Sequence, residues 1–292
     1  MKSRSSLPRR LIVNADDFGL APAVNAGVVE AFRHGILTST TLLANAPAFD
    51  EAVRLARENP GLGVGVHLNL VRGRPLSPAQ TVPLLAGAGG EFRRFRLARL
   101  SRGFLSQAEA EYRRQIERVM EAGLAPTHID FEKHHAWQGP LYLLACRLAG
   151  EYGIGAARTL REPVAWSGRK LSWPGTARMA RAAMLRSGFD MGGGWKDGGL
   201  ARPDRLLGQC HIGAMDERVW LSLVKSLPAG VSEVMTHPGK GGTTAAGEMG
   251  ESWLDGMREV ELAALLSANV REAVDAAGIE LVHFGALKRP ES

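Results

Sequence analysis

Short apolar runs alternate with amphipathic helical patterns along most of this 292-residue chain. The apolar runs predict strands at residues 11–15, 37–43, 63–70, 127–131, 156–160, 232–236 and 279–283. Helical periodicity separates or follows them at residues 21–34, 48–58, 106–122, 140–152, 217–226 and 256–277. Repeated strand–helix units without a Gly-x-Gly-x-x-Gly opening favour a parallel barrel over a dinucleotide-binding fold. We therefore expect an α/β fold, a single-domain distorted (β/α) TIM-like barrel of roughly seven to eight parallel strands.

Two irregular stretches interrupt this alternation, near residues 71–105 and 161–208. The second holds the run Gly192–Gly194 and several tryptophans. Long irregular insertions in a compact domain are often binding loops or lids, so we expect this stretch to border a ligand cleft. Neither an internal repeat nor a linker divides the chain. We therefore expect one barrel domain over residues 1–292.

The charge balance is moderately basic, with a net charge of +6 and a pI near 9.7. Arginine-rich stretches at residues 93–102 and 178–186 lack the regular aromatic interleaving of a nucleic-acid platform. They are typical of solvated helix faces, and we expect no nucleic-acid partner. The basic helix predicted at residues 176–186 could instead make peripheral contact with an anionic membrane surface.

Cysteine content and hydropathy bear on the cellular compartment. The chain has two cysteines, Cys146 and Cys210, which imply no disulfide framework and suit a reducing environment. The apolar run after the basic residues 1–10 is interrupted by polar and acidic residues, so it cannot serve as the core of a signal peptide. No stretch approaches the roughly 20 apolar residues of a membrane span. We expect a cytoplasmic protein, and a homo-oligomer.

The segment Asn14-Ala15-Asp16-Asp17-Phe18-Gly19 directly follows the apolar run Leu11–Val13. An isolated Asp-Asp pair is more often a strand-to-helix turn with a capping aspartate. Here, however, two adjacent carboxylates stand where a buried strand ends, and poorly hydrated like charges need a compensating positive charge. A divalent metal would supply it, with one aspartate as ligand and the other as base.

Polar residues also mark the ends of other predicted strands. His67 lies within an apolar strand, where a lone histidine is usually a core residue, and His237 precedes Pro-Gly, a common turn sequence. Because catalytic groups of such barrels gather at the carboxyl ends of the strands, the coincidence favours one metal site. The densest set of potential ligands is His128, Asp130, Glu132, His134 and His135.

Taken in order, these motifs resemble those of the YdjC-like (ChbG/HpnK) carbohydrate deacetylase family. That resemblance implies a distorted (β/α) barrel that removes acetyl groups from N-acetylated sugars in a metal-dependent reaction. Known members act on chito-oligosaccharides and on a glycosylated hopanoid lipid. It also implies Asp17 and His67 as metal ligands and Asp16 as the base. The matching segments are Asn14–Leu20, Gly35–Thr41, Gly65–Leu68, Thr127–Asp130 and His237–Gly239.

The third metal ligand is where this chain departs from the family pattern. The family usually continues from Thr-His-x-Asp into a His-x-His-x-His run, but the first of those positions, counted from Asp130, is Glu132. Either Glu132 replaces the histidine or His134 takes over. Two anionic ligands make the site harder, so we expect Mg²⁺, with Zn²⁺ and Mn²⁺ as alternatives.

The resemblance implies a mechanism in which a metal-activated water attacks the acetamide of an oligosaccharide or of a glycolipid such as hopanoid-linked N-acetylglucosamine. Asp16 would take the proton of that water, and His237 would protonate the leaving amine, with His134 or His135 as its alternative. We assign His134, His135 and Trp137 to substrate binding. Two other possibilities are a metal-dependent hydrolase of another amide or a phosphoester, and a non-catalytic sugar-binding homologue.

Overall fold

Eight strands join in one parallel sheet in the computed structural model, which describes residues 7–94, 100–137, 139–163, 199–241, 249 and 254–288. Hydrogen-bonded neighbours follow the order β5-β4-β3-β2-β1-β7-β6, and β8 pairs with β1. The strands are β1 (Arg9–Phe18), β2 (Ser39–Leu42), β3 (Gly63–Leu68), β4 (His128–Phe131), β5 (Ala156–Ala157), β6 (Arg205–Leu207), β7 (Gly230–Thr236) and β8 (Glu280–Leu281).

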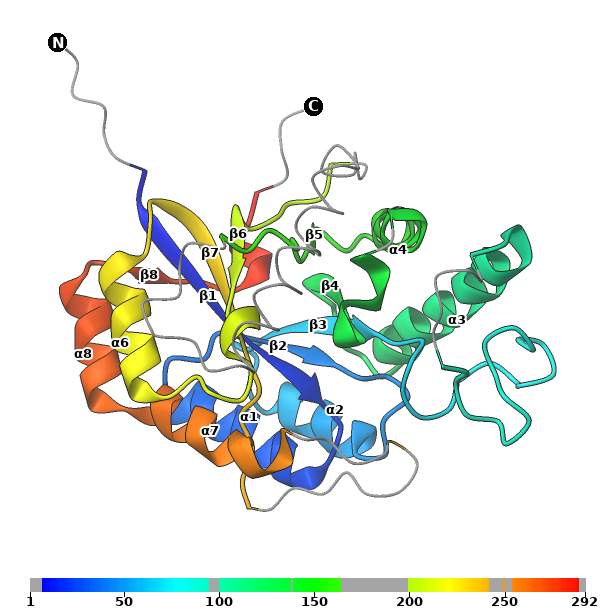
Figure 1. The fold of residues 1–292 in the computed structure, drawn as a ribbon, viewed down its shortest axis with the longest axis horizontal. Helices are drawn as coiled ribbons and strands as arrows, with labels where there is room; N and C mark the ends of the chain where they lie inside the picture. Colours follow the sequence, from blue (N-terminus) through cyan, green and yellow to red (C-terminus); the bar gives the residue numbers. More distant parts are fainter. Residues whose placement is uncertain are drawn as a thin grey trace, which may run out of the picture.

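The sheet curls so that each outer strand hydrogen-bonds to the chain next to the other. Ala157 in β5 donates its N–H to the carbonyl of Ala201, at 3.0 Å, and Leu206 in β6 donates to the carbonyl of Arg161, at 2.9 Å. Strand β1 lies in the middle of the order, with β2 and β3 on one side and β7 and β6 on the other (Figure 1). The expected α/β barrel-like fold is confirmed.

The helices pack on the outside of the curled sheet (Figure 1). Neighbouring helices contact each other, as α3 does with α4 and α6 with α8, and α3 and α4 also contact strands β3 and β4. Side chains that accept the first free N–H groups fix several helix starts, with Ser101 at α3 and Asp216 at α6. The helices are α1 (Pro22–His34), α2 (Phe49–Arg57), α3 (Arg102–Glu121), α4 (Gly139–Glu151), α6 (Glu217–Ser226), α7 (Arg258–Leu266) and α8 (Ala268–Ala276).

The two faces of β1 differ in polarity. Leu11, Val13 and Ala15 belong to the main apolar core, which lies between the sheet and the helices. Because side chains alternate along a strand, Asn14 and Asp16 share the opposite face with Ile12. The barrel interior therefore has an apolar base and becomes polar towards the carboxyl ends of the strands. Its apolar base contains Ile12, Ala156, Ala201, Val282 and Phe284.

Some elements differ from the sequence expectations. Strand β6 lies within the stretch 161–208 that was expected to be irregular, because its short apolar run gives little signal. The helix expected over residues 256–277 is divided into a 3-10 turn, α7 and α8, since Ser267 is extended and caps α8. Residues 164–198, with the basic helix predicted there, lie outside the described residues. Among the residues described, no helix is long and apolar enough to cross a membrane.

Candidate metal centre and active site

The polar residues selected from the sequence lie at the carboxyl ends of four strands. Asp16 and Asp17 stand near the end of β1, and His67 lies near the end of β3. Glu132 begins the 3-10 turn η2 (Glu132–Trp137) that follows β4, and His237 follows β7. All five side chains are buried. The parallel sheet thus gathers at one edge residues that are far apart in sequence.

An irregularity in β1 aims both of its aspartates at this edge. Consecutive side chains of a regular strand point to opposite faces. The register between β1 and β2 shifts between Ala15 and Phe18, and Asp17 has a φ of 71°. Such an irregularity redirects side chains, and a strained non-glycine residue of this kind is typical of functional sites. The adjacent carboxylates can therefore serve one site.

The first group of converging side chains is Asp17, His67 and Glu132. One potential ligand atom from each lies within 4.8 Å of the others. His67 Nε2 is 3.0 Å from Glu132 Oε2. Asp17 and His67 are the metal ligands expected from the sequence, and Glu132 is the first of the two candidates, Glu132 or His134, for the third position. His134 is buried but contributes to neither of the groups found among the described residues.

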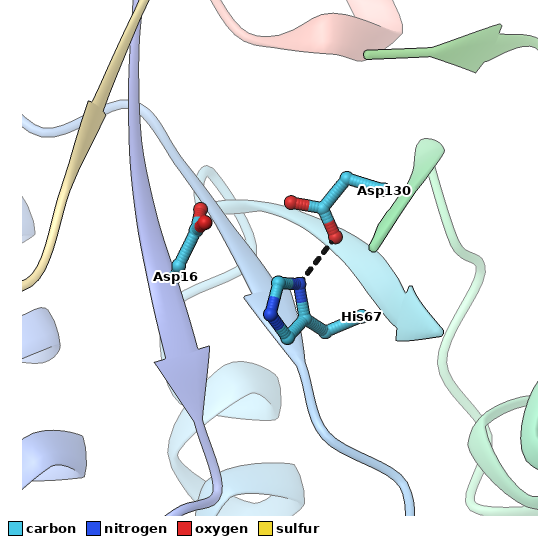
Figure 2. A group of neighbouring side chains, drawn as sticks. All are labelled: Asp16, His67 and Asp130. Carbon is cyan, nitrogen blue, oxygen red and sulfur yellow. Dashed lines mark hydrogen bonds and ion pairs between the residues drawn. The ribbon is translucent and has the colours of Figure 1, made fainter. Parts of the chain in front are cut away.

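A second group shares the same histidine. Figure 2 shows the side chains of Asp16, His67 and Asp130 pointing toward one another from β1, β3 and β4. His67 Nδ1 is 2.6 Å from Asp130 Oδ1, and Thr41 donates its hydroxyl to the other oxygen of Asp130 at 3.1 Å. Asp130 therefore fixes the histidine ring so that Nε2 faces Asp17 and Glu132, as carboxylate partners of metal-binding histidines do.

A buried arginine, Arg158, joins three carboxylates inside the barrel. Its guanidinium donates to both oxygens of Asp16, at 2.8 and 2.6 Å, and pairs with Asp130 at 2.7 Å and with Glu233 at 2.7 Å. Burial alone would raise the pKa of Asp16, but Arg158, together with His67 and His237, outweighs burial and holds that pKa well below its usual range. For Glu233, burial is the stronger influence and raises the pKa to about 7.

Two further arginines flank the first group. Arg258 donates to Asp17 Oδ2 at 2.6 Å, and Arg72 Nη1 lies 3.8 Å from Glu132 Oε1. Burial opposes ionisation of Asp17, but Arg258, with His237 and Arg72, lowers its pKa below the usual range. These cations are sufficient to keep Asp17 ionised at neutral pH.

Both histidines of the site have raised pKa values. Burial lowers the pKa of His67, but Asp130 and Glu132 raise it well above the usual value. Burial likewise lowers the pKa of His237, but Glu261 raises it above the usual value. Glu261 accepts the backbone N–H of His237 at 2.6 Å and lies 3.8 Å from its Nδ1. His237 is therefore an available proton donor near neutral pH, whereas His67 must lose a proton to ligate a metal.

The histidines of the turn after β4 occupy different environments. His135 is bonded on both ring nitrogens, to Tyr112 Oη at 2.5 Å and to the carbonyl of Glu132 at 2.9 Å. Burial lowers the pKa of His135 to about 4, so its ring is neutral. His134 is buried with a φ of 51°. The side chain of Trp137 lies outside the described residues, and the substrate-binding role of all three stays a prediction.

Residues 10–276 match the family model described as YdjC-like protein. The chain belongs to the YdjC-like family. It is 48% identical over 149 residues to a carbohydrate deacetylase of Geobacillus stearothermophilus, a match that covers 51% of this chain and 59% of that protein. A carbohydrate deacetylase of Listeria monocytogenes is 40% identical over 153 residues, which cover 51% of this chain and 60% of the relative. These matches span less than two thirds of the relatives' own length.

A solved structure resembles this protein along most of the chain. It is a putative cellobiose-phosphate cleavage protein of Enterococcus faecalis, 28% identical, with a TM-score of 0.76. The superposition covers 95% of this chain and 98% of that structure. The family and the curled α/β barrel therefore rest on independent comparisons, of sequence and of structure.

The first group of side chains in this YdjC-like protein is suited to a divalent cation. One imidazole nitrogen and two carboxylates are acceptable ligands for Zn²⁺, Mn²⁺ or Mg²⁺. Ligand atoms about 2.0 to 2.3 Å from one ion lie within about 4.6 Å of each other. The candidate atoms here, which all lie within 4.8 Å of one another, are therefore close enough to share an ion. Arg258 holds one oxygen of Asp17, so that carboxylate can offer its other oxygen.

Proposed function

We propose that this protein is a metal-dependent hydrolase that removes the N-acetyl group from an N-acetylated sugar. The observation that carries the proposal is the convergence of Asp17, His67 and Glu132 beside Asp16, at the edge of the barrel where His237 also lies. The names of the YdjC-like relatives support the choice of an N-acetylated sugar as substrate.

In this proposal Asp17, His67 and Glu132 hold the cation, and Mg²⁺ is the expected ion, with Zn²⁺ and Mn²⁺ as alternatives. The bound cation would supply Lewis-acid chemistry, polarising the acetamide carbonyl and lowering the pKa of a water molecule. Each of the three side chains contributes one ligand atom.

Asp16 is the proposed general base. Its carboxylate is ionised at neutral pH because Arg158 holds both of its oxygens. It is also fixed in place by Asn14, which donates to Oδ1 at 3.0 Å. A carboxylate that is ionised and oriented in advance needs no reorganisation to accept a proton. Its low pKa makes it a weak base, so in this proposal the transfer depends on a water molecule whose pKa is lowered.

His237 is the proposed general acid. Its raised pKa favours the imidazolium form, and Glu261 fixes the backbone at His237 by accepting its N–H. Protonation of the amine as the C–N bond breaks lets the sugar leave as a neutral amine, and acetate is the other product.

The decisive experiment is acetate release from a panel of N-acetylglucosamine oligosaccharides and N-acetylglucosamine-linked lipids, with and without added Mg²⁺, Mn²⁺ or Zn²⁺. We expect metal-dependent acetate release from at least one sugar. If the protein binds a metal and hydrolyses another amide or a phosphoester but releases no acetate, it is a metal-dependent hydrolase of a different bond and not a deacetylase. If the protein binds sugars but turns none of them over with any of the three metals, it is a non-catalytic sugar-binding homologue.

A further inference from the structure

The turn that carries Glu132 is conformationally strained. Directly after β4, Lys133 and His134 adopt φ of 50° and 51°. Two successive non-glycine residues in the left-handed region are uncommon, because their Cβ atoms crowd the backbone. Such a turn persists only when its surroundings hold it. The position of the Glu132 carboxylate therefore depends on whatever fixes residues 132–135.

A buried pair of side chains closes this turn. His135 Nδ1 lies 2.9 Å from the carbonyl of Glu132, and a carbonyl can only accept, so Nδ1 carries the proton. The other ring nitrogen then accepts, and Tyr112 Oη is 2.5 Å from it and can donate. Both side chains are buried, with Tyr112 fully inaccessible. The chain of contacts runs from Tyr112 through His135 to the backbone of Glu132.

Tyr112 belongs to a row of buried polar residues on α3 that also fastens the segment after β3. Glu111 accepts the backbone N–H groups of Leu76 and Ser77, both at 2.9 Å. Gln115 accepts from the N–H of Asn69 at 2.9 Å and donates to its carbonyl at 2.7 Å. One helix thus holds the chain just after the two strand ends that bear His67 and Glu132.

We propose that Tyr112 is a positioning residue for the metal centre: its hydroxyl, acting through His135, sets the place of the Glu132 carboxylate relative to His67. This inference rests on the proposed metal site and adds a residue beyond the three side chains that would hold the ion. Partners of this kind, beyond the ligands themselves, commonly change metal affinity by about 10- to 100-fold when removed.

The test compares two tyrosine-to-phenylalanine variants of the full chain. Tyr112→Phe removes only the hydroxyl that faces His135. Tyr152→Phe removes the hydroxyl that donates to Glu117 at 2.6 Å, a contact that also fastens α3 but is partly exposed and away from the site. The dissociation constant for Mn²⁺ is measured by calorimetry, the Co²⁺ absorption spectrum reports ligand geometry, and thermal unfolding of the metal-free proteins controls for folding.

We expect Tyr112→Phe to weaken Mn²⁺ binding by about tenfold or more and to alter the Co²⁺ spectrum, while Tyr152→Phe binds like the parent. If the parent and Tyr112→Phe bind Mn²⁺ with equal affinity, the inference is wrong. It is also wrong if both variants lose the same affinity for Mn²⁺, because that would indicate a general loosening of α3. Acetate release is a separate readout. A parent that binds Mn²⁺ but releases no acetate contradicts the deacetylase alone, and a parent that binds no metal contradicts both proposals.

Discussion

Replacing Arg158 with methionine should lower the unfolding free energy of the metal-free protein by about 3 to 5 kcal/mol at pH 7. Arg158 is fully buried and pairs with Asp16, Asp130 and Glu233. Methionine fills similar space but carries no charge, so the carboxylates lose their shared counter-ion in a site that water does not reach. Breaking a buried ion pair from one side costs this much because the remaining charge stays uncompensated.

The pH dependence has a definite sign. In the parent, Arg158 holds the pKa of Asp16 below its unfolded value, so that stabilisation is present at neutral pH and is lost only in strong acid. In the variant, burial dominates and raises the pKa of Asp16, so the folded protein takes up protons that the unfolded chain does not. The stability of the variant therefore rises, relative to the parent, as the pH falls from 7 toward 5.

Urea unfolding of both proteins, in the presence of a chelator at pH 7 and pH 5, measures this difference. With about 2.1 cal/mol/K of unfolding entropy per residue, 3 to 5 kcal/mol corresponds to roughly 5 to 8 °C in Tm for a chain of 292 residues. Arg113→Met is the matched control, because Arg113 also pairs with two carboxylates but is partly exposed, and it should cost less than about 1 kcal/mol. An Arg158→Met variant that loses no more unfolding free energy than Arg113→Met would contradict the prediction. So would a difference in unfolding free energy between Arg158→Met and the parent that is as large at pH 5 as at pH 7.

Three further predictions concern the site itself. Asp17→Ala and His67→Ala should each abolish stoichiometric metal binding, measured by elemental analysis after dialysis; full metal in both would contradict their assignment. Asp16→Asn should keep the metal but lose at least about 10² in kcat, the usual share of a general base, and near-normal turnover would exclude that role. Glu132→Gln should weaken metal binding more than His134→Gln, because Glu132 lies within the converging group; the opposite order would make His134 the ligand.

Much of the fold could be predicted from periodicity because most strands of the barrel are continuous apolar runs. Strand β6 was missed since three residues give no measurable pattern, and β5 is only two residues long where five were expected. The break at Ser267 was also missed, although a serine within a long helical pattern is a possible N-cap. These errors arise where hydrogen bonds to neighbouring strands or local capping, and not hydrophobic pattern, define the element.

The sequence revealed the candidate site residues at the strand ends but not their partners inside the barrel. Asp16, Asp17 and His67 could be found because polar side chains at the ends of apolar strands stand out in the sequence. Arg158 and Glu233 were not recognised, although a charge inside a predicted buried strand is itself a signal, since it must find a partner. Which partner it finds depends on the closure of the barrel, which brings together residues distant in sequence. Periodicity carries no information on that pairing.

The arrangement of charges bears on what a metal would do in this protein. Arg258 pairs with Asp17, His67 with Glu132 and Arg158 with Asp16. Because each of these buried carboxylates has a cationic partner, the fold does not need an ion to relieve repulsion among them. On the proposed function, the ion would serve the chemistry, while Arg158 and Arg258 keep Asp16 and Asp17 ionised and in place.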